Sequence, residues 1–376
     1  MKTLFSREIV NTGRQTELDV LKVVTIFEMI FMHLQEVVFS YAYNDRIFIH
    51  DSLGLVFACN ALYLVGPFSF LFSMGCTIPF SRRNDARSNM RRGAGLFVVW
   101  ILLNALRMIP YGMLLHSTTG VAFKELYFNL LWANDVLFFA GAFFLLFGFL
   151  QMIKLSIGKI ALFFAALFLA AQCAGDFGRF LPEATHRFFA GIFNVGHLSS
   201  FALFNWGIVV MLGVGWGSLL QRTSGKTKLY AATEIAGIAA VTVLLGALYF
   251  AGALDGEVLR RSTSNPLGVH QLGFVSLAGA LAVLAFVLPL FYFLALALPE
   301  AVKKMISAVS GVILPIYFFH WLLLPWLGFV PQMRDGRAGA EKIVFVALTL
   351  YAASFLLAFL YKLVKKRILA SFSPAK

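Results

Sequence analysis

The residues with the clearest chemical potential lie in the first long apolar stretch, residues 17–41, which carries several ionisable side chains. An apolar run of this length predicts a membrane-spanning helix, and ionisable groups at membrane depth are costly and usually functional. On a helix, Lys22 and His33 lie about 20° apart around the axis and about 16 Å apart along it. Asp19 and Glu36 fall on the same side, within roughly 60° of Lys22. The stretch predicts a polar stripe with a cation near its start and an imidazole further along. The alternative is structural, with Lys22 and Asp19 anchoring the helix end and His33 bonding a neighbour.

The composition indicates what kind of protein must position this stripe. The chain has 376 residues, of which 60% are hydrophobic and only 13% are charged. Ordinary soluble domains are roughly 45–50% apolar and about 25% charged. The apolar runs are continuous, which is unlike the alternating strands of an outer-membrane barrel. The first twenty residues lack an uninterrupted apolar core, so we expect no cleaved signal peptide. The sequence therefore predicts an all-α, polytopic integral membrane protein.

Charge and cysteine content exclude other classes. The net charge of +13 is concentrated in short loops, where it fits membrane orientation, so we expect no nucleic-acid partner. The three cysteines all lie in apolar runs, which offers neither a disulfide framework nor a zinc-binding spacing. We therefore expect no bound metal.

We expect about ten transmembrane helices in one bundle, forming a single domain over residues 1–376. The domain divides into an N-terminal segment 1–17, the spans within 18–364 and a tail 365–376. Inner segments carry roughly twice as many Lys and Arg residues as outer loops, which predicts that both termini are cytoplasmic. The outer segment 175–196 is long enough for a short interfacial helix. The predicted spans are 18–41, 53–80, 93–115, 127–150, 160–174, 197–220, 229–253, 272–298, 306–329 and 342–364.

This topology predicts a shared polar layer. All seven histidines fall in outer loops or outer halves of spans, although the headgroup region alone accounts for most of the loop histidines. Five polar residues from five spans lie at a similar depth, about 12 Å below the outer surface. A polar layer in an apolar bundle predicts a buried site, although Arg107 and Asp135 are equally compatible with a structural ion pair. The five residues are His33, Arg107, Asp135, Asn205 and His320.

An arginine-rich segment lies on the inner side. Residues 81–92, SRRNDARSNMRR, contain five arginines, including Arg82, Arg83, Arg91 and Arg92. Much of this charge is what membrane orientation requires. Arginine also suits phosphate recognition, and coenzyme A carries phosphates. The segment therefore predicts either a plain topology signal or an anionic ligand held at the cytoplasmic face.

Several of these stretches carry a family resemblance. Lys22 and His33 form an R/K-x10-H pattern similar to that of the first helix of acyltransferase type 3 membrane proteins. The late segment ILPIYFFHWLL, residues 313–323, resembles the Tyr…His helix of the same proteins. Two other segments resemble heparan-α-glucosaminide N-acetyltransferase and its bacterial relatives: GPFSFLFSMGCTIPFSRR at 66–83 and LFNWGIVVMLGVGWGSLL at 203–220. The order of the four matches resembles that of the broad transmembrane acyltransferase superfamily.

The resemblance implies a reaction. An acyl group, usually acetyl, would pass from cytoplasmic acyl-CoA to a hydroxyl or amine of an extracytoplasmic glycan or glycolipid. His33 would be the catalytic base, or the carrier of an acyl-histidine intermediate. His50, in the first outer loop, is the alternative, because the heparan-type branch places its important histidine there. The RxxR pattern of the family is absent from 81–92.

On the interpretation of the chain as an acyltransferase, we expect the following further roles. Lys22, Arg82, Arg83, Arg91 and Arg92 would hold acetyl-CoA at the inner face. Asp135 or Glu36 would orient the imidazole. Glu36, Arg107, Asn205 and His320 would contact the acceptor. The partners would be membrane lipids, acyl-CoA and the acceptor, and the location a bacterial inner membrane.

Two other functions are compatible with intramembrane charge. A secondary transporter for an anionic solute also places charges at mid-membrane, but many transporters show two related halves with paired broken helices, and the chain shows no such symmetry. A structural or signalling membrane subunit leaves the stripe of Lys22 and His33 unexplained.

Overall fold

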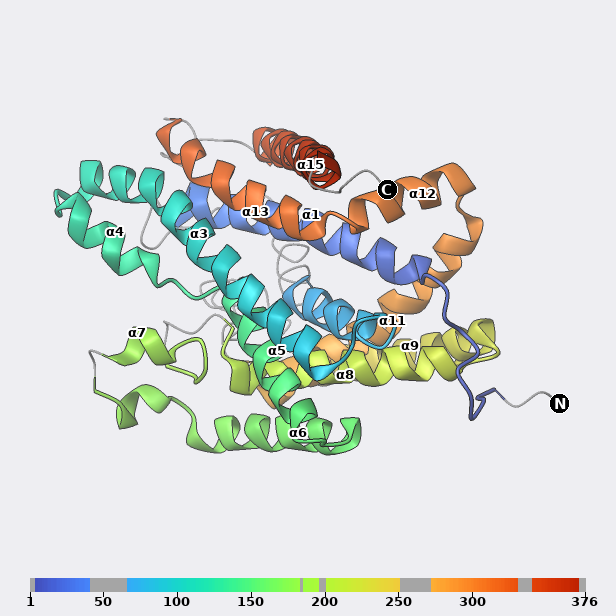
Figure 1. Cartoon of the computed structure of the whole chain (residues 1–376). Coiled ribbons are helices and arrows are strands. Elements are labelled where there is room, and N and C mark those ends of the chain that lie inside the picture. Colours follow the sequence, from blue (N-terminus) through green and yellow to red (C-terminus); the bar gives the residue numbers. More distant parts are fainter. Residues whose placement is uncertain are drawn as a thin grey trace. The chain divides into compact units, whose positions relative to one another are not determined.

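The structure is a computed structural model that describes residues 4–40, 66–182, 185–195, 201–250, 272–330 and 340–371 (Figure 1). Within these ranges every labelled element is a helix, and the one β-type contact is an isolated bridge between Phe5 and Thr223. The described part of the chain therefore agrees with the all-α class that its composition predicts.

Six helices in the described ranges are long and apolar enough to cross a membrane, or seven if a bent pair counts as one span. They are α3 (Ala86–Thr119), α6 (Ile157–Ala174), α8 (Leu203–Arg222), α9 (Lys226–Phe250), α11 (Phe274–Ala297) and α15 (Ala340–Ser371). The chain is thus an integral membrane protein by the length and composition of its helices. The total of about ten spans stays a prediction.

Two predicted spans are interrupted. The span predicted at 127–150 is wrong as one helix, because α4 (Phe123–Leu131) ends before α5 (Val136–Met152) begins. Asp135 is the N-cap of α5, and its carboxylate accepts hydrogen bonds from the backbone N–H groups of Leu137 and Phe138. These bonds satisfy donors that the first turn of a helix leaves unpaired, which makes Asp135 a starting point for a new helix.

The span predicted at 306–329 is bent by 63°. It comprises α12 (Glu300–Ser310), α13 (Ile313–Leu323) and the 3₁₀ helix η5 (Leu324–Phe329), and the bend lies between α12 and α13. The outer segment 175–196 contains two short elements, η1 (Phe177–Phe180) and α7 (His186–Phe189). The helix that carries the polar stripe, α1 (Thr16–Ser40), is continuous over 25 residues.

The chain divides into two compact units. Unit 1 comprises Met1–Leu21, Leu53–Leu102 and Trp132–Leu296, and unit 2 comprises Lys22–Ser52, Leu103–Leu131 and Ala297–Lys376. Each unit is assembled from segments far apart in the sequence.

The core of unit 1 is built from α5, α6, α8 and the helical residues 66–77. Phe143 lies 5.6 Å from Phe147 and 5.1 Å from Phe164, measured between ring centroids, and all three side chains are fully buried. Helix 66–77 meets α8 through glycines, since a Cβ at Gly75 would lie 2.0 Å from the carbonyl oxygen of Val210. The two backbones are therefore in direct contact.

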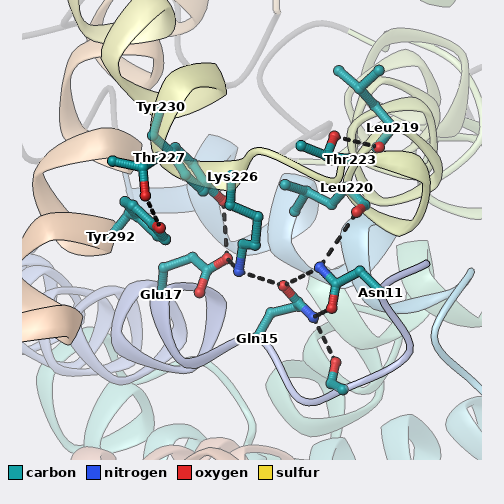
Figure 2. A network of polar contacts seen from close by, with 11 residues as sticks. Asn11, Gln15, Glu17, Leu219, Leu220, Thr223, Lys226, Thr227, Tyr230 and Tyr292 are labelled. Carbon is teal, nitrogen blue, oxygen red and sulfur yellow. Dashed lines mark hydrogen bonds and ion pairs between the residues drawn. The ribbon is translucent and has the colours of Figure 1, made fainter. Parts of the chain in front are cut away.

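The N-terminal segment of unit 1 is fixed to the turn between α8 and α9. Backbone hydrogen bonds join Ser6 to Arg222, and Val10 and Asn11 to Gln221. The side chain of Asn11 also donates to the carbonyl of Leu220 (Figure 2). These bonds hold residues 4–15 against the end of α8.

A buried ion pair lies beside this segment (Figure 2). Lys226 Nζ is 2.6 Å from Glu17 Oε1 and 2.7 Å from Gln15 Oε1. Tyr230 donates its hydroxyl to the same Glu17 oxygen at 3.0 Å, and the ammonium lies 5.3 Å from the centre of the Tyr292 ring. The pair connects the starts of α1 and α9 with α11.

In unit 2, α13 packs against α15. The part of α1 in this unit contacts both helices, because Phe27 meets Tyr351 edge-on and His33 meets α13. This arrangement brings the imidazole of the polar stripe against the late Tyr…His helix.

Candidate functional site

The centre of the candidate site is a pair of histidines in unit 2. His33 Nδ1 lies 3.1 Å from His320 Nε2, a hydrogen-bond distance between residues 287 positions apart. The two rings are almost parallel, with an interplanar angle of 3°. His320 is fully buried and His33 is half-buried. The contact joins two of the five residues that the sequence predicts in one polar layer.

Trp321 lies beside the histidine pair, and Arg107 lies against Trp321. The ring of Trp321 lies 4.3 Å from that of His33, and the guanidinium carbon of Arg107 lies 4.4 Å from the centre of the Trp321 ring. Arg107, from α3, is only 4% exposed. A guanidinium over an indole face is attracted by the ring quadrupole, more strongly when water is excluded. Trp321 therefore contacts both the buried cation and the imidazole.

Helix geometry explains why α13 presents these groups together. Tyr317 and His320 are three residues apart, hence neighbours on one helix face, and their ring centroids are 5.1 Å apart. Tyr317 and Ile316 are both buried beside His320. The apolar surroundings limit the water that reaches the histidine pair.

The pair can hold and transfer a proton. One imidazole must donate and the other accept in the shared hydrogen bond, so the tautomers of the two rings are linked. If His33 Nδ1 donates to His320 Nε2, then His33 Nε2 carries a lone pair and faces away from the bond. A neutral imidazole with a free lone pair is the form that acts as a general base.

The other predicted residues of the stripe lie as follows. Lys22 is half-buried on α1, about 16 Å along the helix from His33. Asp19 forms an ion pair with Arg14, at the start of the same helix. Glu36 lies within the helical residues, but its side chain is outside the described ones. His50, the alternative catalytic residue, lies outside the described residues altogether.

Asp135 and Asn205 belong to unit 1, whereas His33, Arg107 and His320 belong to unit 2. Asp135 caps α5, and Asn205 Nδ2 donates to the carbonyl of Leu272 at 3.3 Å. Both have structural roles in their own unit. Their membership in one polar layer with the histidine pair stays a prediction.

The arginine-rich segment 81–92 also lies in unit 1. Arg82, Arg83 and Arg91 are exposed, whereas Arg92 is half-buried, donates to Ser81 Oγ at 3.3 Å and lies 4.9 Å from the centre of the Phe144 ring. Arg92 thus has partners within the protein, while the three exposed side chains have the accessibility that an anionic ligand requires.

Asp85 directly precedes α3 within this basic segment. Its carboxylate accepts hydrogen bonds from the hydroxyl and the backbone N–H of Ser88, which hold the pKa of Asp85 below its ordinary value. These bonds favour the charged form of the carboxyl. The Asp85 carboxylate therefore caps the start of α3.

Sequence reasoning did not single out Trp321, Glu17 or Lys226. Trp321 directly follows His320, so an aromatic neighbour of a candidate histidine was a usable signal. Glu17 and Lys226 stand at predicted helix ends, where charge is ordinary, and only their 2.6 Å contact reveals a buried pair.

No group of three or more His, Cys, Asp or Glu side chains within the described ranges is arranged to hold a metal ion. Comparison with known proteins finds no matching family model, no matching curated protein and no matching solved structure. The functional conclusion therefore depends on the geometry and on the sequence patterns.

Proposed function

We propose that the protein is an integral membrane acyltransferase that moves an acyl group, acetyl in the simplest case, from acyl-CoA to a hydroxyl or amine. The observation that supports it best is the 3.1 Å hydrogen bond between His33 and His320 within apolar surroundings. An imidazole that is oriented by a hydrogen bond can act as a general base towards the O–H or N–H of an acceptor.

The proposed reaction assigns a role to each group in the cluster. His33 Nε2 takes the proton from the acceptor O–H or N–H while the acceptor oxygen or nitrogen attacks the thioester carbonyl. The C–S bond then breaks, CoA leaves as the thiolate, and the proton held by His33 neutralises it. His320 is a positioning residue, because it fixes the tautomer of His33 through Nδ1.

The remaining assignments complete the proposal. The exposed Arg82, Arg83 and Arg91, together with Lys22, are assigned to the phosphates of CoA. Arg107, which contacts Trp321, is assigned to stabilising the negative charge that develops on the thioester oxygen. The acceptor is an extracytoplasmic glycan or glycolipid, and the location is a bacterial inner membrane.

The test is transfer of labelled acetyl from acetyl-CoA to envelope glycans and glycolipids by the purified, reconstituted protein. His33→Gln is expected to lower the transfer rate by about 100- to 10,000-fold, the usual value of general base catalysis. His116→Gln is the matched control, because His116 is exposed on α3 and lies outside the cluster. It should retain the wild-type rate.

Two results would contradict the proposal in different ways. A normal rate in His33→Gln with loss of activity in His50→Gln would move the catalytic role to the loop histidine. Uptake of an anionic solute into sealed vesicles, with no covalent transfer of label, would replace the enzyme with a transporter.

A further inference from the structure

The C-terminal part of α15 extends past the length that a membrane requires. Between Lys342 and Lys362 the sequence IVFVALTLYAASFLLAFLY contains no charged residue. At 1.5 Å per residue, the distance between the two lysines is about 30 Å, which matches the hydrocarbon thickness of a bilayer. Lys362 therefore marks one edge of the hydrocarbon, and α15 continues to Ser371.

This extension lies at headgroup level. The polar layer on each side of a bilayer is roughly 5–8 Å thick, so the helical turns after Lys362 pass through it. Residues 362–371 include four basic side chains and no acidic one. Leu363 and Val364, which lie between basic residues, and Ile368, which directly follows them, are 44%, 53% and 50% exposed.

A second basic element lies in the same unit. On α12, the polar residues Glu300, Lys303, Lys304, Ser307 and Ser310 fall within one arc of about 120°, and the apolar residues fill the opposite side. Val309 on the apolar side is buried, whereas Met305 on that side is 60% exposed. Glu300, the one acid on α12, forms an exposed ion pair with Lys303 at 2.9 Å.

Both elements lie at the same end of unit 2. Only ten residues join η5 to α15, and α13 packs against α15, so the two helices are antiparallel neighbours. The start of α13, next to α12, is then level with the C-terminal part of α15. The bend inclines α12 by 63° away from the direction of α13.

We propose that these two elements form a basic collar that binds the headgroups of anionic membrane lipids. The collar consists of Lys303, Lys304, Lys362, Lys365, Lys366 and Arg367. Basic residues directly beside a span attract anionic lipid, and the exposed apolar side chains between them enter the boundary of the acyl chains. A soluble phosphate uses only the charges and leaves Leu363, Val364 and Met305 uncovered. The collar does not depend on the proposed acyl transfer.

The test is equilibrium binding of a fluorescent phosphatidylglycerol to the lipid-stripped full-length protein in neutral detergent. Lys365→Gln with Lys366→Gln is expected to weaken binding roughly 30-fold, since each basic residue at the membrane surface contributes about 1 kcal/mol. Lys303→Gln with Lys304→Gln should weaken it in the same direction, and added salt should weaken binding to the wild-type protein.

Two controls separate lipid binding from a folding defect or from general charge. Lys365→Arg with Lys366→Arg keeps the charge and should bind as the wild type does. Lys154→Gln with Lys159→Gln removes the same charge from exposed positions of unit 1 and should bind within a few-fold of wild type.

Three results would overturn the proposal that the collar binds anionic lipid. Phosphatidylcholine could bind as tightly as phosphatidylglycerol, or the Lys365 and Lys366 glutamine variant could bind normally. Alternatively, inorganic phosphate or CoA could displace the lipid from the collar at its own binding concentration, which would show a site for soluble phosphates.

Discussion

At the scale of single residues, the histidine pair and the buried ion pair differ in what their surroundings allow. His33 and His320 share one hydrogen bond in which one ring donates and the other accepts, so the ring nitrogen outside that bond remains available to exchange a proton. Lys226 and Glu17 are opposite charges with further partners on both sides. The histidine pair is therefore suited to proton transfer, and the ion pair is suited to stabilising the fold.

We predict that Lys226→Met lowers the free energy of unfolding by about 3–5 kcal/mol, because it leaves the Glu17 carboxylate buried without its cation. The side chain of Glu17 is 3% exposed and that of Lys226 is 25% exposed, so solvent screens the pair little. The measurement is chemical unfolding in detergent, followed by tryptophan fluorescence.

The double variant Glu17→Gln with Lys226→Met is the control for that prediction. It removes both charges, so it should recover part of the stability lost in Lys226→Met. Equal or greater loss in the double variant would show that the unpaired Glu17 carboxylate is not the cause of the loss in Lys226→Met.

At the scale of elements, glycines decide how closely helix 66–77 approaches α8. A Cβ at Gly213 would lie 2.1 Å from the carbonyl oxygen of Phe72, and a Cβ at Gly217 would lie 2.3 Å from that of Cys76. Because the clashing oxygens belong to the backbone, the clash cannot be relieved by a side-chain rotation. Gly215, on the same helix, has nothing within 4 Å of its Cβ position.

Gly213→Ala and Gly215→Ala form a matched pair on α8. We expect Gly213→Ala to destabilise the protein by about 1–3 kcal/mol or more, because overpacking forces the two helices apart. Gly215→Ala should be neutral or stabilising by up to about 1 kcal/mol, since alanine favours the helix. Thermal unfolding of both variants in the same detergent tests the pair, and equal effects would refute the close approach.

Two predicted spans, 127–150 and 306–329, show where hydropathy fails to predict a break within a helix. Residues 127–150 are largely apolar, so hydropathy predicts one span. The cap at Asp135 is a local hydrogen-bonding arrangement that hydropathy does not register. A carboxylate followed by an apolar helix is a recognisable N-cap signal. The bend between α12 and α13 likewise lies at two residues, Gly311 and Val312, which end one helix and begin the next.

At the scale of the whole molecule, the proposed reaction moves the acyl group from the cytoplasmic side of the membrane to the outer side. The inner arginines are assigned to the donor, and the predicted topology places the histidines in the outer half of the spans. The acyl group would therefore cross by being transferred, and CoA would stay on its own side.

We predict that acyl-CoA supports transfer only from the cytoplasmic side of sealed vesicles, and that a membrane-impermeant acceptor works only from the opposite side. Protease access to an N-terminal tag gives the orientation of each preparation. Transfer with both substrates confined to one side would contradict the arrangement while leaving the acyltransferase chemistry possible.

The sequence alone determined the class of the protein and the position of most helices, because apolar length and helix period are local properties of the chain. It also selected His33, since an imidazole in an apolar helix is conspicuous whatever surrounds it. The contact with His320 and Trp321 was decided by tertiary structure, because it joins residues 287 positions apart and depends on the packing of α1 against α13. The ion pair of Glu17 with Lys226 has the same origin. A charge at a helix end is compatible with solvent or with burial, and only the packing of the surrounding helices fixes which one holds.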